Sequence, residues 1–119
     1  MQHIGVGARS SEAVIHNGIA LFAITPERPY DAKLSAGEQA RQALARLDAR
    51  LEKLGSSKAN VMFVTIVLAD MASYDEINAA WDSWIDKAAP PARACISARL
   101  ASPAMKIELI VQAGVTGGR

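Results

Sequence analysis

"PPARACISARLASPAMKIELIVQA", residues 90–113, is the stretch of this sequence that says most about the fold. Its first half alternates between apolar Ala94, Ile96, Ala98 and Leu100 and the mostly polar Arg93, Cys95, Ser97 and Arg99. A period of two predicts a β-strand over residues 92–100. A second strand is expected over residues 106–113, where Ile107, Leu109 and Val111 form the apolar set. Pro103 between them indicates a loop.

The two strands are expected to pair with each other as a hairpin. Apolar side chains meet when Ser97 lies opposite Glu108, Cys95 opposite Ile110 and Arg93 opposite Gln112. Arg93, Cys95, Ser97 and Glu108 are then predicted to share one face, the one away from the helices. These residues are therefore the candidate functional site.

Two amphipathic helices are predicted earlier in the chain. The first begins at Ser35, forms a capping box with Glu38 and ends at Gly55. Its apolar stripe is Ala40, Leu44, Leu47, Leu51 and Leu54. The second begins at Ser73, again three residues before a glutamate, and continues to the break at Pro90-Pro91. Its apolar side carries Ile77, Ala80, Trp81, Trp84 and Ile85.

The other segments are predicted to be strands. Asn17-Gly18 is a strong hairpin-turn signal between "AVIH" and "IALFAI", and "HIGV" at residues 3–6 is a weaker strand prediction. Residues 61–68 are apolar at nearly every position, which predicts a strand buried on both faces, with Met62, Val64, Ile66 and Leu68 on one side. The expected order is β-β-β-α-β-α-β-β.

Composition limits the classes of function. The 119 residues fit a single domain, residues 1–119, with a flexible tail from about residue 114. The net charge is +1 and no basic stripe is present, so a nucleic-acid partner is not expected. The longest apolar run, "VMFVTIVLA", is too short to cross a bilayer, and no export signal precedes it. No membrane partner is expected either.

Cysteine and histidine usage indicates neither a disulfide nor a metal site. Cys95 is the only cysteine, and His3 and His16 are distant from it in the sequence. A cytoplasmic protein is therefore expected.

The strand predicted at residues 61–68, which is apolar on both faces, also indicates how the protein assembles. Two helices cover only one face of a six-stranded sheet, so the apolar side chains on the other face need a cover. With no sequence left over, the simplest cover is another copy of the chain, and a homo-oligomer packed sheet against sheet is predicted.

"PARACI", residues 91–96, followed by Ile107-Glu108-Leu109, closely resembles the signature of the Rid family (reactive intermediate deaminases, also called YjgF). The resemblance covers residues 12–113 and includes "NGIALFAITP", "EQARQALARLDARLEKLGSS" and "VTIVLADMASYDEINAAWDSWI", which contains Asn78. Two features depart from the better-known deaminases. "VGARSSEAV" lacks their tyrosine, and Ala23-Ile24 stands where their Ser-Gly pair is expected.

The resemblance implies a chorismate-mutase-like α+β fold, a mixed six-stranded sheet with two helices on one face, assembled as a homotrimer with clefts between subunits. It implies hydrolysis of reactive 2-imino acids, such as 2-aminoacrylate, to 2-keto acids and ammonia without a cofactor or metal. Arg93 would anchor the substrate carboxylate through two charge-assisted hydrogen bonds, and Glu108 would orient the attacking water. Cys95 would contribute backbone groups, and Asn78 would form part of the cleft wall.

Each of these residues also has a plainer interpretation. Arg93 fits a solvated strand residue, Glu108 an ion pair with Arg99, Cys95 an inert core residue and Asn78 a solvated helix residue. At the level of the whole protein, a regulatory trimer that binds a small carboxylate without turnover is the main alternative. A ribonuclease is a second alternative, which the near-neutral charge disfavours.

Overall fold

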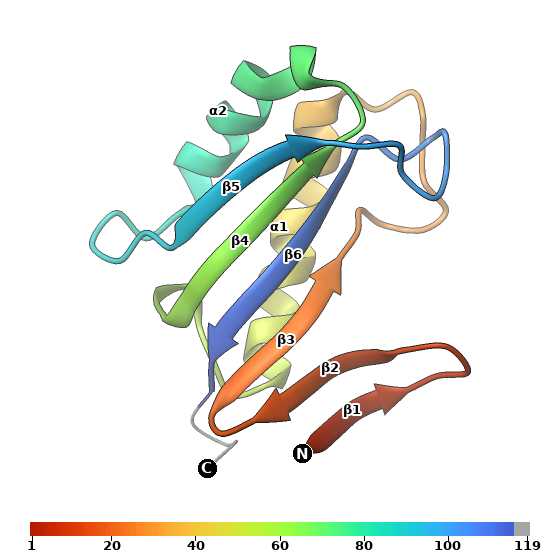
Figure 1. The fold of residues 1–119 in the computed structure, drawn as a ribbon. Coiled ribbons are helices and arrows are strands. Elements are labelled where there is room, and N and C mark those ends of the chain that lie inside the picture. Colours follow the sequence, from red (N-terminus) through yellow and green to blue (C-terminus); the bar gives the residue numbers. More distant parts are fainter. Residues whose placement is uncertain (116–119) are drawn as a thin grey trace.

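The computed structural model describes residues 1–115, which form one six-stranded sheet (Figure 1). The strands are β1 (Gln2–Val6), β2 (Ser11–His16), β3 (Ile19–Ile24), β4 (Val61–Leu68), β5 (Ala92–Ser97) and β6 (Ile107–Gly114). Their order in the sheet is β1-β2-β3-β6-β4-β5. Only β4 and β5 run parallel, and the other neighbours are antiparallel. The predicted order of elements and the mixed α+β sheet are confirmed.

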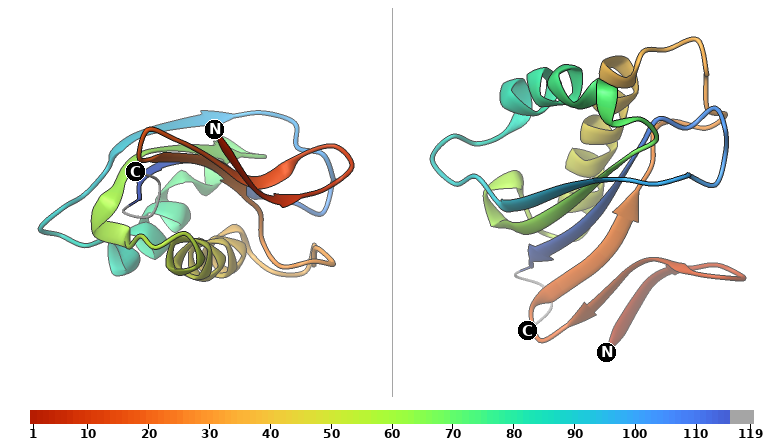
Figure 2. Two further views of the ribbon diagram at one scale, coloured as in Figure 1. Left: turned by 90° about the horizontal axis from the view of Figure 1, so that it is seen from below. Right: turned by 45° about the horizontal axis from the view of Figure 1, so that its top comes forward.

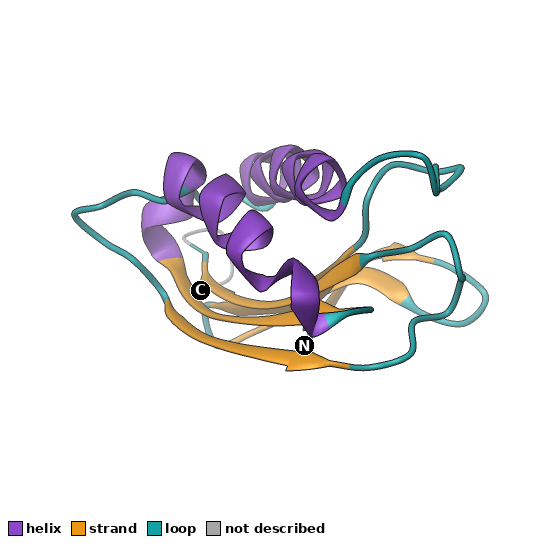
Figure 3. Ribbon diagram, turned by 90° about the horizontal axis from the view of Figure 1, so that it is seen from above, coloured by secondary structure: helices purple, strands orange, loops and turns teal. Residues whose placement is uncertain are grey.

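The two helices, α1 (Ala36–Lys53) and α2 (Tyr74–Trp84), lie on the same side of this sheet. Figure 3 and the left view of Figure 2 show the helices as one layer and the strands as the other. Short 3₁₀ turns at Lys58–Asn60 and Met71–Ser73 precede β4 and α2. The opposite side of the sheet, called the bare face below, carries no element from the described residues.

Local sequence signals account for α1. The Ser35 hydroxyl accepts the Glu38 N–H at 3.1 Å, and the Glu38 carboxylate accepts the Ser35 N–H at 3.1 Å, so the predicted capping box is present. The predicted stripe of Ala40, Leu44, Leu47, Leu51 and Leu54 is buried. Gly55 ends the helix with a φ of 74°, a conformation that glycine adopts without strain.

Helix α2 begins where predicted, with Ser73 as its N-cap residue, but the expected capping box is absent. The Ser73 side chain makes no capping hydrogen bond, and Asp70 instead accepts the Ala72 N–H at 2.9 Å in the 3₁₀ turn that leads into the helix. The helix ends at Trp84, well before Pro90.

The Asn17-Gly18 turn is confirmed. Both residues have positive φ angles, 51° and 76°, and His16 pairs with Ile19 across the turn. Two consecutive left-handed residues match the right-handed twist of the flanking strands.

The predicted alternation along β4 fails at its first residues. Val61 pairs with Ala113 and Phe63 with Gln112, so a bulge at Met62 returns Val61 to the helix-facing side. Val61 is buried there with Val64, Ile66 and Leu68, whereas Met62 is exposed.

The expected hairpin of β5 with β6 is also wrong. Strand β4 lies between them, and it pairs in parallel with β5 and antiparallel with β6. Strand β5 ends at Ser97, three residues earlier than predicted, and the following loop crosses the end of β4. There Ala98 donates to Leu68 O, and Ala69 donates to Lys106 O, both at 3.0 Å.

The C-terminal tail was expected from about residue 114. Gly114 still belongs to β6, and Val115 is buried, with its N–H donating to Gly18 O at 2.9 Å. The rest of the predicted tail, residues 116–119, lies outside the described residues.

Gln39 joins the loops at one end of the sheet. Its side chain is fully buried, and its amide nitrogen donates to Asp31 O at 3.0 Å and to Ala104 O at 2.8 Å. Its amide oxygen accepts the Lys106 N–H at 2.8 Å. One side chain thus satisfies three backbone groups, from the β3–α1 connection and from the loop before β6.

Candidate functional site

The structure places Arg93 on the helix-facing side of the sheet, not on the bare face. Arg93 pairs with Val64 of β4 and Cys95 pairs with Ile66, and both of these valine and isoleucine side chains belong to the buried core. The alternating residues Ala94 and Ile96 therefore point to the bare face. The period of two correctly predicted which β5 side chains share a face. The prediction of which set faces the helices was wrong.

The Arg93 side chain extends along α2 and is held there by two aromatic residues. Its Nη2 donates to the Tyr74 hydroxyl at 3.3 Å. Its Cζ lies 5.9 Å from the centre of the Tyr74 ring and 5.4 Å from that of Trp81. These cation–π contacts fix the guanidinium at the β5 edge of the sheet.

Asn78 lies on the same stripe of α2 as these two rings. It follows Tyr74 by four residues and precedes Trp81 by three, and such spacings place side chains on one side of a helix. Its Oδ1 is buried and has no hydrogen-bond partner in the described part of the chain. A buried acceptor without a partner costs about 1–3 kcal/mol, so this atom marks a place for a donor from a ligand or a water.

Cys95 packs partly buried against the core beside this stripe. Burial raises the pKa of its thiol, and the nearby Arg93 cation opposes that rise. The thiol is therefore held in its neutral form, as expected for an inert core cysteine.

Glu108 does not join this group. It pairs with Val67 of β4, whose other partner is Ile96, so Glu108 lies on the bare face. The only ion pair among the described residues joins Lys53 to Glu12, which rejects the alternative pairing of Glu108 with Arg99.

Glu108 instead lines a cavity of about 420 Å³ that sequence reasoning missed. This arginine cavity, as it is called below, is also lined by Ala23, Thr25, Arg28, Arg46 and Arg50. The spacing of Arg46 and Arg50, four residues apart on α1, is the one sequence signal for it. Nothing in the sequence indicated that β2 and β3 separate there and leave room for these side chains.

The bare face is apolar around Glu108. Leu21, Ile96 and Ile110 are about half exposed, at 50%, 48% and 47%, and Ile19 is exposed at 37%. They come from β3, β5 and β6, so the patch crosses most of the sheet. An apolar patch of this extent is typical of a surface that another protein covers.

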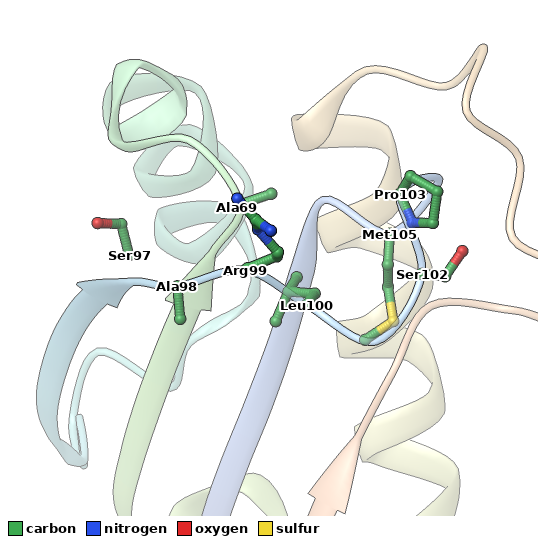
Figure 4. A pocket seen from close by; sticks show the side chains of 8 residues that line it. All are labelled: Ala69, Ser97, Ala98, Arg99, Leu100, Ser102, Pro103 and Met105. Atoms are coloured by element: carbon green, nitrogen blue, oxygen red, sulfur yellow. The ribbon is translucent and has the colours of Figure 1, made fainter.

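A second cavity, of about 460 Å³, lies at the loop that follows β5 (Figure 4). Arg99 and Met105 are among the residues that line it, whereas Arg93, Cys95, Asn78 and Glu108 do not. It is therefore separate from the candidate site.

Residues 1–115 contain neither a membrane-spanning helix nor a metal-binding cluster. No described helix has the length and apolar character needed to cross a membrane. Within the same residues, no three His, Cys, Asp or Glu side chains lie close enough together to hold a metal ion.

Comparisons with known proteins point to one family. The family model described as "Endoribonuclease L-PSP" matches residues 2–115. A RutC family protein of Haemophilus influenzae is 42% identical over 93% of this chain and 95% of its own length. The RutC family protein YoaB of Escherichia coli is 39% identical over 94% of this chain and 96% of its own.

The solved structures give the same result. A YjgF family member from Neisseria meningitidis superposes with a TM-score of 0.88 at 38% identity. The match covers 96% of this chain and 93% of that one.

Proposed function

Because this chain belongs to the endoribonuclease L-PSP family, which contains the RutC and YjgF (Rid) proteins, we propose that it is a homotrimeric deaminase of small 2-imino acids. It would hydrolyse enamines and imines such as 2-aminoacrylate to 2-keto acids and ammonia. The observation that carries this proposal is the Arg93 guanidinium, held over the Trp81 ring of α2, the helix on which Asn78 presents an unpartnered amide oxygen. Neither a cofactor nor a nucleic acid takes part, and we expect the protein to act in the cytoplasm.

The trimer is supported by the bare face. Leu21, Ile96 and Ile110 together form an apolar surface that a monomer leaves in water. Burying such surface is worth about 25 cal/mol per Å², so three copies packed through this face would gain stability from it. A closed ring of identical contacts leaves no copy with an unpaired face.

The cleft would then combine residues from two chains. Arg93 and Glu108 lie on opposite faces of one sheet, so they cannot meet around a small substrate within one subunit. Arg93 is carried by the edge strand β5, and Glu108 lies on the bare face, where a neighbour would pack. Both can serve one substrate when the edge of one copy lies against the bare face of the next.

Arg93 suits the binding of a 2-imino carboxylate. Its single hydrogen bond to a described residue uses Nη2, so the guanidinium keeps donors for both oxygens of a carboxylate. Stacking on Trp81 fixes its direction before the ligand arrives, which reduces the entropy lost on binding.

The reaction needs only water. A water oriented by Glu108 adds to the imine carbon, and its proton passes through the carboxylate to the nitrogen. The hydroxyl proton of the resulting carbinolamine then passes to the nitrogen, the C–N bond breaks, ammonia leaves and the 2-keto acid remains. Asn78 and the Cys95 backbone would form the wall around the reacting carbon, and the neutral thiol stays outside the chemistry.

The test compares two arginine variants. With 2-aminoacrylate generated in the assay, wild type should hydrolyse it faster than buffer, and Arg93→Gln should return the rate to that of buffer. Arg99→Gln removes an arginine from the loop after β5 and should leave the rate unchanged. A wild-type rate equal to buffer would reject the deaminase.

One observation favours a second function, a trimer that binds a small carboxylate without turnover. Ala23 lines the arginine cavity with Glu108 and stands where the better-known deaminases have part of a Ser-Gly pair. In that case a 2-keto acid would raise the melting temperature of wild type and not of Arg93→Gln, with no acceleration of hydrolysis.

A further inference from the structure

The arginine cavity exists because β2 leaves β3 shortly after their turn. The two strands pair only from Val14 to His16, against Ile19 to Leu21. Beyond these pairs the β1–β2 hairpin diverges from the sheet, as Figure 1 shows. The cavity opens at this separation, with Ser11 and Glu12 on one side and Ala23 and Thr25 on the other.

Arginines from two elements reach into the cavity, and each keeps part of its guanidinium free. Arg46 uses Nη1 alone, which donates to Thr25 O at 2.9 Å, Thr25 Oγ1 at 3.0 Å and Pro26 O at 2.9 Å. Arg50 likewise uses Nη1, which donates to Glu12 O. Their Nε and Nη2 groups have no hydrogen-bond acceptor among residues 1–115. Hydrogen bonds to the protein therefore use less than half of the N–H donors on each guanidinium.

The third arginine, Arg28, is exposed and donates through Nε to the Tyr30 hydroxyl at 3.1 Å. Its two terminal nitrogens have no acceptor in the described part of the chain. Arg28 belongs to the connection between β3 and α1, so it approaches the cavity from a different element than Arg46 and Arg50.

The positive charge of these three arginines is only partly neutralised by the two carboxylates, Glu12 and Glu108, that line the same cavity. No carboxylate lies within ion-pair distance of Arg28, Arg46 or Arg50 in the described residues, and Glu12 is paired with Lys53 at 2.8 Å. Burial lowers the pKa of the Arg50 guanidinium, the attraction of Glu12 opposes that change, and the weaker repulsion from Arg46 adds to it. A half-enclosed group of cations with spare donors is suited to an anionic group.

Glu108 lines the same cavity, and this connects the cavity to the proposed reaction. We propose that the arginine cavity binds a second carboxylate of the substrate, so that the preferred substrates are imines of amino diacids. This inference rests on the proposed function for the chemistry at Glu108. Arg93 would hold the carboxylate next to the imine carbon, and Arg28, Arg46 and Arg50 would hold the carboxylate at the far end.

The reaction on such a substrate balances with water alone. Water adds to the C=N carbon of the imino diacid, the C–N bond breaks, and ammonia and a 2-oxo diacid are released. The distal carboxylate is unchanged throughout, so the cavity contributes binding and orientation only.

The test uses two probes of equal chain length, 2-oxoglutarate and 2-oxopentanoate, which differ only in the distal carboxylate. By titration calorimetry, wild type should bind 2-oxoglutarate at least about tenfold more tightly, the effect of one charge-assisted hydrogen bond. Arg28→Gln and Arg50→Gln should each remove most of this preference. The kcat/KM for the imine of glutamate, relative to that of norvaline, should fall in parallel.

Arg41→Gln is the matched control. Arg41 lies on the same helix as Arg50, and its Nη1 donates to the Ser83 hydroxyl at 3.3 Å, away from the arginine cavity. It should leave the preference unchanged. Because Arg28 is exposed and braces no backbone group, Arg28→Gln should fold, and unchanged circular dichroism would confirm this.

The outcomes separate the two proposals. Equal binding of both probes, or an equal loss of the 2-oxoglutarate preference in Arg41→Gln, overturns the diacid inference. If Arg93-dependent turnover of the norvaline imine persists in that case, the proposed deaminase activity is still supported. Conversely, an Arg28- and Arg50-dependent preference for 2-oxoglutarate without turnover of either imine supports the diacid cavity and rejects the deaminase.

Discussion

Arg93 and Glu108 lie on opposite faces of the same sheet. Both residues pair with strand β4, at positions that are three residues apart. Arg93 is the neighbour of Val64 and Glu108 the neighbour of Val67. An odd separation along a strand reverses the direction of the side chain. Any chemistry that uses both residues therefore requires two copies of the chain.

This relationship predicts complementation between two inactive variants. Arg93→Gln and Glu108→Gln trimers should each be inactive in imine hydrolysis. When they are unfolded together and refolded as a mixture, random assembly gives about a quarter of the clefts an intact arginine and an intact glutamate. Activity should recover to about that share of wild type. No recovery, in trimers shown to be mixed by mass spectrometry, would place both residues in one subunit and contradict the proposed cleft.

The exposed apolar residues of the bare face lead to a prediction about the proposed trimer. Ile110 is half exposed in the single chain, so Ile110→Lys should leave the fold intact while placing a charge in the proposed interface. Sedimentation should then give a mass near that of the 12.6 kDa monomer. Ala45→Lys, on the solvent side of α1, is the control and should remain trimeric. An unchanged mass for Ile110→Lys would show that this face does not form the interface.

Because Gln39 makes three buried hydrogen bonds, we expect one uncharged substitution there to cause a large loss of stability. Gln39→Leu keeps the side-chain volume close but removes the partners of three backbone groups, at Asp31, Ala104 and Lys106. The free energy of unfolding in urea should fall by about 3 kcal/mol or more. Gln42→Leu, three residues along the same helix, removes a single bond to the Glu27 N–H and should cost less than about 1 kcal/mol.

The surroundings of the Cys95 thiol predict how its rate of alkylation depends on pH. Burial raises its pKa above that of a free cysteine, and the Arg93 cation limits the rise. Alkylation by iodoacetamide should therefore reach half its maximal rate at a higher pH than it does for a cysteine peptide. In Arg93→Gln the midpoint should move higher still, because the stabilising cation is gone. A midpoint below that of the peptide would show that the thiol is activated rather than inert.

The parts of the fold that depend on neighbouring residues in the chain could be predicted from the sequence. Ser35 and Glu38 cap α1, and Asn17-Gly18 turns β2 into β3, because each signal acts over a few residues. The pairing of β5 could not be predicted in the same way. A period of two shows which side chains share a face, but it says neither which strand lies alongside nor which face is buried.

The candidate site shows the same limit. Arg93 and Asn78 could be singled out through the resemblance, but the direction of Arg93 depends on α2. Its guanidinium lies over the Trp81 ring, so a charged residue faces the helix layer while Ile96 faces outward. The arginine cavity could not be predicted because it depends on where β2 leaves β3, which no residue pattern marks.

The position of β5 at the margin of the sheet has one more consequence. Its backbone is held by β4 on one side only, so in an isolated chain its amide protons should exchange with solvent sooner than those of β6, which is flanked on both sides. Docking of a second subunit against that margin would slow the exchange. Strand β5, which carries Arg93, would then be rigid only at concentrations where the chains associate, and the specific rate would drop on dilution.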